Sequence, residues 1–96
     1  MAFIHIVTFK WRDESVDSVA IADALRDLAT RLDGVQSYLC GPDAGHAPGA
    51  DDFAVVGTFD DAEIFAAYRD HPEHQRIVRE MILPNVESRT VVQLAD

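Results

Sequence analysis

The sequence has a single cysteine, few basic residues and no long apolar run. Cys40 has no second cysteine to pair with, which excludes an intramolecular disulfide and is typical of a reducing compartment. Eight Lys and Arg stand against seventeen Asp and Glu, and the net charge of −9 argues against nucleic acid or an anionic membrane surface as a partner. No apolar segment approaches the ~20 residues that cross a bilayer, and no basic or cleavable segment precedes the first strand-like run. We therefore expect a cytoplasmic protein that binds neither nucleic acid nor membrane.

The remaining composition is that of one small folded domain. Apolar residues make up 48% of the 96 residues, which is enough for a hydrophobic core. No repeat, low-complexity tract or linker interrupts the chain, so a single domain over residues 1–96 is predicted. A domain of this size buries only about two-thirds of the surface of its unfolded chain, so its stability is limited unless a partner adds burial.

Local residue patterns predict four strands and a first helix. Runs rich in β-branched and aromatic residues predict the strands, at residues 3–11, 35–40, 53–59 and 87–94. Apolar residues at Ile21, Leu25, Leu28 and Leu32 recur at helical spacing and predict an amphipathic helix over residues 16–32, ended by Gly34. Residues 41–52, rich in Gly, Pro and Asp, predict a surface loop.

A second, interrupted helix completes the pattern. Asp60 or Asp61 is expected to cap it, with Glu63 as a capping-box partner of Asp60. Pro72 disfavours helical torsion angles at His71, so a break is expected there before a further helical stretch. The order βαββαβ predicts a ferredoxin-like α+β fold, in which a four-stranded antiparallel sheet carries two helices on one face.

The sheet is predicted to be apolar on both faces. In the first strand Val7 and Phe9 share one face with His5, while Ile4 and Ile6 share the other. Two helices can cover only one face, and a large exposed apolar patch is uncommon on a monomer. We therefore expect a homodimer through the sheet face opposite the helices. The alternative is a sheet that tolerates Ala, Thr and a few Ile or Val in water.

Three histidines and a tyrosine are the candidate chemical groups. Tyr68, His71 and His74 fall within seven residues around Pro72, and His5 interrupts the first apolar strand. Imidazole titrates near neutral pH, so a cluster of histidines can move protons under ordinary conditions. If the fold brings His5 and His74 together, they define a candidate pocket.

The run His5-Ile6-Val7-Thr8-Phe9-Lys10 and the signature Tyr68-x-x-His71-Pro72-x-His74 resemble the stress-responsive α/β-barrel (Dabb) family over nearly the whole chain. The resemblance implies a dimeric α+β barrel with a pocket in each protomer between sheet and helices. In a plant polyketide cyclase of this family, a tyrosine and a histidine of the signature catalyse an aldol condensation without a cofactor, and they correspond to Tyr68 and His74. Its strand histidine corresponds to His5, whereas Phe53 stands where that enzyme has a further pocket histidine.

Each candidate has a functional and a structural interpretation. His74 would shuttle a proton, Tyr68 would stabilise a developing oxyanion and His5 would orient the substrate or His74. Alternatively, His74 bonds to backbone or water, Tyr68 completes the core and His5 bonds to the second helix. The other expected substrate-binding residues are Val7, Phe9, Leu25, Phe53, His71 and Val78.

The leading functional hypothesis is therefore a homodimeric protein that binds a small hydrophobic molecule and catalyses cofactor-free proton transfer of the cyclase or isomerase type. No cofactor is expected, and no metal, because the His71-x-x-His74 pair has no evident third ligand. One alternative is a non-catalytic, stress-related dimeric binding protein. A weaker alternative, suggested by fold analogy alone, is a cofactor-independent monooxygenase.

Overall fold

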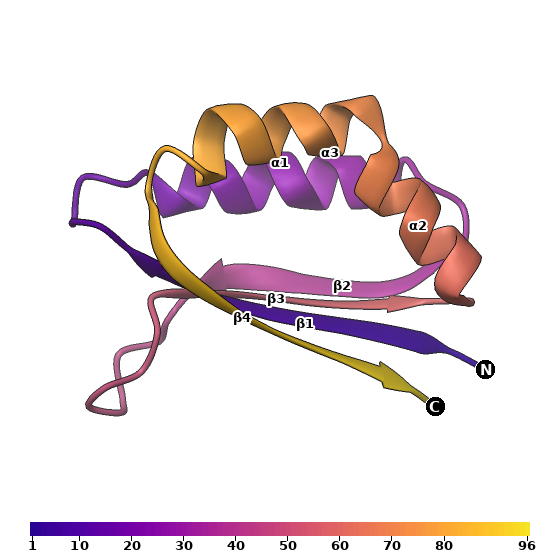
Figure 1. Ribbon diagram of the computed structural model, residues 1–96, viewed down its shortest axis with the longest axis horizontal. Coiled ribbons are helices and arrows are strands. Elements are labelled where there is room, and N and C mark those ends of the chain that lie inside the picture. The colour runs from indigo at the N-terminus through magenta and orange to yellow at the C-terminus, as the bar shows by residue number, and fades with distance from the viewer.

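The structure is a computed structural model that describes residues 1–96, and it contains four strands and three helices (Figure 1). The strands are β1 (Phe3–Trp11), β2 (Val35–Pro42), β3 (Phe53–Phe59) and β4 (Val86–Ala95). The helices are α1 (Ser18–Thr30), α2 (Ala62–Asp70) and α3 (Pro72–Ile77), and α3 continues into a π-helical turn, η1 (Val78–Ile82). The predicted ferredoxin-like α+β order is confirmed. The second predicted helix is divided into α2, α3 and η1.

The four strands form one antiparallel sheet in the order β2-β3-β1-β4. Residues of β3 alternate between buried and half-buried, as the alternation of the sequence predicts, and Phe53, Val55 and Phe59 point into the core. In β1 the buried residues Val7, Phe9 and Trp11 lie on the same side. These inward faces pack beneath the helices, so the core lies between the sheet and the helical layer.

The first helix is shorter at both ends than the predicted 16–32. It begins after Asp17, whose side chain accepts a hydrogen bond from the Ala20 N–H. This bond gives a partner to one of the backbone N–H groups that lack one at the start of a helix. After Thr30 the chain turns, and Gly34 has a left-handed φ of +83°. A Cβ on Gly34 would lie 2.8 Å from Ile64 Cγ2, so both the torsion angle and the close approach favour glycine.

The second helix is capped by one of the two predicted aspartates. The Asp61 side chain accepts from the Ile64 N–H, whereas Asp60 accepts from the Gln36 side chain, so the expected capping box with Glu63 does not form. The predicted break at His71 is confirmed, because its extended ψ of 133° precedes Pro72. The last strand begins at Val86 and ends at Ala95, one residue beyond the predicted limits at each end.

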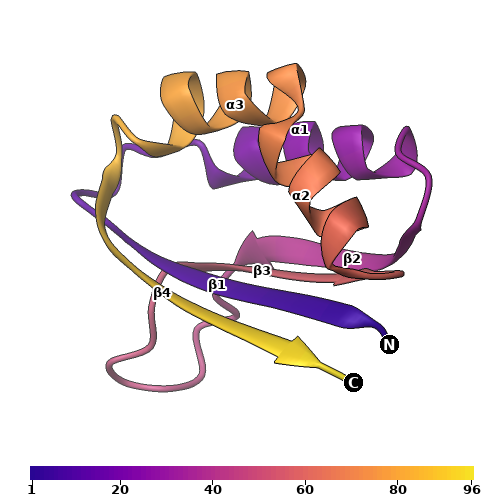
Figure 2. The same ribbon diagram turned by 45° about the vertical axis from the view of Figure 1, so that its right-hand side comes forward.

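All helices lie on one side of the sheet, and the opposite side is uncovered (Figures 1 and 2). The loop between β2 and β3 extends below this open face, and the Thr8 hydroxyl holds it by donating to the Asp51 carboxylate at 2.6 Å. The two termini lie side by side at one end of the sheet, where Ala2 and Asp96 exchange backbone hydrogen bonds. No helix is long and apolar enough to span a membrane.

Candidate active site

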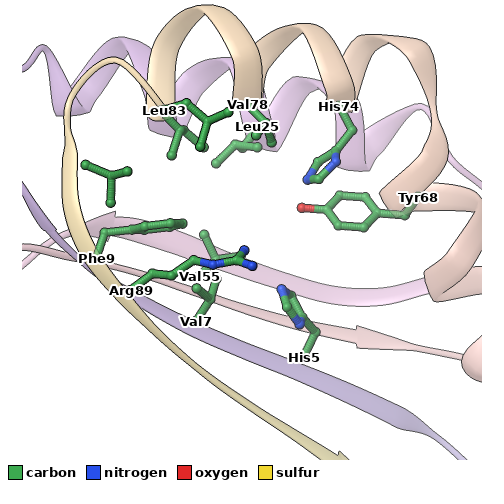
Figure 3. Close-up of a pocket in the computed structure, with 12 residues that line it drawn as sticks. His5, Val7, Phe9, Leu25, Val55, Tyr68, His74, Val78, Leu83 and Arg89 are labelled. Atoms are coloured by element: carbon green, nitrogen blue, oxygen red, sulfur yellow. The ribbon is translucent and has the colours of Figure 1, made fainter.

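A cavity lies between the sheet and the broken second helix (Figure 3). Its sheet wall comes from β1, β3 and β4, and its helical wall comes from α1, α2, α3 and η1. The lining residues are His5, Val7, Phe9, Leu25, Val55, Tyr68, His74, Val78, Ile82, Leu83, Val86 and Arg89. The fold therefore brings together His5, Tyr68 and His74, which are distant in sequence.

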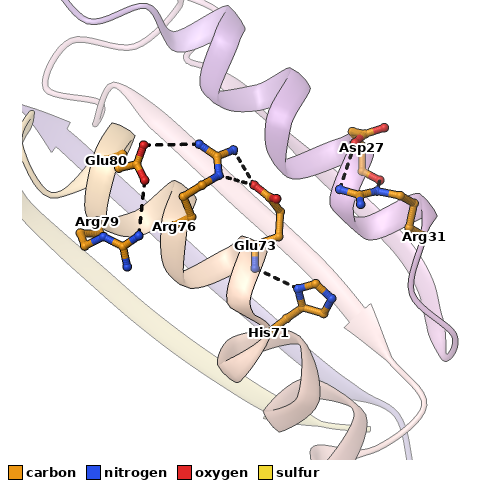
Figure 4. A network of polar contacts seen from close by, with 7 residues as sticks. All are labelled: Asp27, Arg31, His71, Glu73, Arg76, Arg79 and Glu80. Atoms are coloured by element: carbon orange, nitrogen blue, oxygen red, sulfur yellow. Dashed lines mark hydrogen bonds and ion pairs between the residues drawn. The ribbon is translucent and has the colours of Figure 1, made fainter.

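Seven of the nine residues expected at the site line this cavity, and Phe53 and His71 do not. Phe53 is only 1% exposed, and its ring packs against Phe9 and Trp11 deeper in the core. The His71 Nδ1 accepts a hydrogen bond from the Glu73 N–H at 3.0 Å and caps α3, on the side of the helix that carries the exposed ion pairs (Figure 4). His71 therefore caps the helix that follows the break at Pro72 and does not take the expected place in the substrate-binding wall.

Pro72 indirectly orients His74. Because proline has no N–H and the Glu73 N–H bonds to His71, no backbone donor reaches the carbonyl of Arg69. The His74 Nδ1 lies 3.0 Å from this oxygen. A carbonyl oxygen only accepts, so Nδ1 carries the proton, and the neutral imidazole has its free lone pair on Nε2. The helix break therefore sets the tautomer that can act as a base.

Burial keeps His74 uncharged. It lowers the pKa of His74 below the ordinary value of about 6.5, and the nearby His71 lowers it further, while the bond to Arg69 and the charge of Asp70 partly oppose the shift. The ring lies against Tyr68, with 4.4 Å between ring centroids, and Figure 3 shows both side chains directed into the cavity. At neutral pH, Nε2 is thus available to accept a proton.

Tyr68 is both a core residue and a cavity residue. Its ring packs on Phe59 and Phe65, and its hydroxyl lies 2.6 Å from the hydroxyl of Tyr38. Burial raises the pKa of Tyr68 to about 12, even though the Tyr38 hydrogen bond acts in the opposite direction. The phenol therefore stays protonated at neutral pH and can donate a hydrogen bond, but cannot act as a base.

His5 bonds to β4 and not to the second helix as expected. The Gln93 amide nitrogen donates to His5 Nδ1 at 3.1 Å, which puts the proton of the neutral ring on Nε2. Burial lowers the pKa of His5, and the charges of His74 and Arg89 lower it further. Its ring packs against Phe65 at 4.8 Å between centroids. His5 therefore acts as a second neutral donor on the wall formed by the sheet.

Two polar residues of the site were missed by sequence reasoning. Arg89 enters the cavity because it pairs with Phe9 across the β1–β4 ladder and so shares its inward face. Tyr38 reaches Tyr68 from β2, where the register shifts between Val35 and Ser37. Alternation along each strand suggests which residues share a face, but pairing between strands is needed to place Arg89 in the cavity and Tyr38 beside Tyr68.

The cavity is small. It amounts to about 80 Å³, whereas an apolar cavity of about 150 Å³ is known to take up benzene. A groove that opens beside it shares His5, Tyr68, His74 and Arg89, so these four residues lie at the junction of the two spaces. A bound molecule would therefore place a small group inside and extend past this junction.

The lowered pKa values of His5 and His74 predict that the folded protein is less stable in mild acid. Both groups bind protons more readily in the unfolded chain than in the folded one, so their contribution to stability is complete above pH 6.5 and is lost as the pH falls through and below that value. We expect the free energy of unfolding in urea to decrease between pH 7 and pH 5. His74→Gln should reduce this pH dependence, and an unchanged slope in that variant would contradict the assignment.

Comparison with known proteins places this architecture in a family. The model of the stress responsive A/B barrel domain (Dabb) matches residues 3–95. An uncharacterized protein of Streptomyces coelicolor is 31% identical over 75 residues, covering 74% of this chain and 77% of that protein. A crystal structure from Thermobifida fusca, described as a dimeric ferredoxin-like protein of unknown function, is 37% identical, with a TM-score of 0.89 over 100% of this chain and 92% of that one.

A more distant structure, the hydroxynitrile lyase from Passiflora edulis, shares the fold at 17% identity, with a TM-score of 0.78 over 97% of this chain and 91% of its own. The family match covers both segments that carried the resemblance in the sequence, the N-terminal strand and the tyrosine–histidine signature around Pro72. The chain therefore belongs to the stress responsive A/B barrel domain family.

Proposed function

We propose that the protein is a homodimer whose protomers each bind a small hydrophobic, oxygen-bearing molecule and transfer a proton to and from it without a cofactor. The observation that carries this proposal is the complementary protonation of two adjacent groups. His74 presents a free lone pair on Nε2, and Tyr68 presents a phenol that stays protonated. A base beside a hydrogen-bond donor suits the removal of a proton next to a carbonyl.

The proposed step begins with a substrate carbonyl oxygen near the Tyr68 hydroxyl. His74 Nε2 takes a proton from the neighbouring carbon, and the electron pair of the broken C–H bond moves into the enolate. Tyr68 donates a hydrogen bond to the enolate oxygen, and His5 Nε2–H orients the substrate from the opposite wall. Return of the proton from His74 to another carbon gives isomerisation. Attack of the enolate carbon on a second carbonyl of the same molecule closes a ring and leaves an alkoxide, which takes the proton back from His74.

Apolar side chains on the uncovered sheet face support the homodimer. Ile4, Ile6, Ala54 and Val56 lie on the central strands, with Leu39, Val92 and Leu94 beside them in register. Leu39 is 70% exposed, Val92 50% and Leu94 47% in the single protomer. The Thermobifida fusca relative is described as dimeric. A second copy packed face to face on this patch would remove it from water.

Deuterium exchange tests the proton transfer directly. In D2O, the protein should accelerate incorporation of deuterium next to the carbonyl of short alkyl or aryl methyl ketones, as measured by proton NMR. Tyr68→Phe should lower the exchange rate about a hundredfold, the usual loss for one oxyanion donor. Tyr38→Phe is the matched control, because it breaks the same 2.6 Å hydrogen bond but leaves the cavity hydroxyl in place. Equal losses in both variants, or no exchange by the wild type, would contradict the mechanism.

Binding without turnover is the second candidate, and the small volume of the cavity favours it. About 80 Å³ of interior leaves little room for a reacting molecule unless Val78 or Leu83 moves. On this alternative, ketones and related molecules stabilise the fold in thermal-shift measurements while deuterium exchange stays at the rate of free imidazole. The two candidates therefore differ in one measurement made on the same ligands.

A further inference from the structure

Arg89 is the only arginine in the chain without a partner. Every other arginine makes an ion pair or a hydrogen bond to the protein. Most of these ion pairs lie on outer helix surfaces, as the group around Arg76 and Glu80 in Figure 4 illustrates. Arg89 is an exposed residue of β4, and it has no ion pair although the chain contains seventeen acidic residues. This is the result expected if its position keeps carboxylates away.

The position of Arg89 has that property. Its backbone pairs with Phe9, and Figure 3 shows the guanidinium extending from β4 into the cavity between Phe9 and His5, on the side that faces Tyr68. No residue that lines the cavity or the adjoining groove carries a carboxylate. Arg69, the other arginine of the groove, is already paired with Asp70. Arg89 therefore brings one uncompensated positive charge to the junction of the two spaces.

We propose that Arg89 selects a ligand with a single carboxylate, which its guanidinium binds at the junction between cavity and groove. A planar guanidinium matches a carboxylate through two parallel hydrogen bonds. The inference rests on the proposed function only in that the cavity binds a small molecule, and it does not require proton transfer.

The charge and the shape of the site favour a monoanion with an apolar body. His5 and His74 are neutral at pH 7, so Arg89 supplies the only full positive charge on the cavity wall, which suits one carboxylate better than a phosphate dianion. The rest of the wall is mainly aliphatic and aromatic. With Tyr38 donating to Tyr68, the Tyr68 O–H and the His5 Nε2–H can each donate to a second oxygen, so a keto or hydroxy acid with an alkyl or aryl chain fits the donors present.

Binding of matched probe pairs tests this selectivity. Phenylacetate and hexanoate are each compared with the corresponding neutral amide by isothermal titration or ligand-observed NMR at low salt. The wild type should bind each carboxylate at least tenfold more tightly than its amide, in keeping with a charge-assisted pair. Arg89→Gln should remove the preference and leave the affinity for the amide unchanged, while Arg89→Lys should retain part of it.

Arg79→Gln is the matched control, because it removes the same charge from an exposed arginine on η1 outside the cavity. It should keep the full preference. A second readout needs no ligand: in Arg89→Gln the NMR titration of His5 should move to higher pH, because a neighbouring positive charge has been removed. A preference that survives Arg89→Gln, carboxylates that bind no better than amides to the wild type, or tighter binding of phenyl phosphate than of phenylacetate would each overturn the proposal.

The two proposals fail separately. His74→Gln and Tyr68→Phe should lower the rate of deuterium exchange at least about a hundredfold but keep the preference for carboxylate over amide. Loss of exchange with the preference intact supports both proposals. A preference without any exchange in the wild type supports only the selectivity of Arg89, and exchange without a preference supports only the proton transfer.

Discussion

Replacing His74 with glutamine is expected to lower the rate of deuterium exchange by two to four orders of magnitude, the usual contribution of a positioned general base. The glutamine amide can still donate to the Arg69 carbonyl, so the helix break at Pro72 should persist. What the variant lacks is the basic nitrogen on the cavity side. The effect should therefore appear in the rate and not in the affinity for a ketone.

The pH dependence adds a second check on His74. Because burial lowers its pKa, the exchange rate of the wild type should stay constant from pH 8 to pH 7 and decline only below pH 6.5, as the base becomes protonated. His46→Gln is the matched control, since His46 lies in the exposed loop between β2 and β3. A similar rate in His74→Gln and His46→Gln would show that His74 is not the base.

Replacing Val56 with glutamate is expected to convert the proposed dimer to monomers. Val56 lies on the central strand β3, beside Ile6 and Leu39 on the uncovered face. An uncompensated charge buried in an apolar interface costs about 3–5 kcal/mol. Twofold symmetry introduces the charge twice, so dissociation should be favoured by about 6–10 kcal/mol, or more than a ten-thousandfold change in the dissociation constant.

Light scattering coupled to gel filtration measures this effect directly. Val19→Glu is the control, because Val19 is equally apolar but lies on α1, on the helical side of the protomer, where it is 62% exposed. Val56→Glu should remain folded by circular dichroism, since Val56 is only half-buried in the single protomer and lies on the uncovered face of the sheet. Dimers that persist in Val56→Glu and dissociate in Val19→Glu would place the interface on the helices instead of the sheet.

Prediction from sequence was most accurate where structure depends on local pattern. The first strand and the third have the predicted bounds, because alternation and flanking turn residues mark both ends. The break at His71 followed from the steric effect of Pro72 on its neighbour. The sequence predicted that α1 ends at residue 32, but the helix ends at Thr30. Leu32 continues the apolar spacing and packs against the core, although it lies in the turn that leads to Gly34.

The site was only partly predictable. Tyr68, His74 and His5 line one cavity as the resemblance implied, but Phe53 lies deeper in the core than expected. The alternation of residues along β3 predicted that the Phe53 side chain points into the core. Its depth depends on how Phe9 and Trp11 pack over it, and packing between strands cannot be inferred from one strand alone.

The sequence by itself determined the elements, their order and the apolar character of both sheet faces, because these follow from periodicity and from the steric rules of proline and glycine. Only the tertiary structure decided which polar groups meet. The path of the broken helix places the Arg69 carbonyl where it orients His74. Strand register brings Tyr38 to Tyr68 and places Arg89 beside Phe9. Those contacts join residues far apart in the chain, and the local pattern of each segment carries no information about its distant partner.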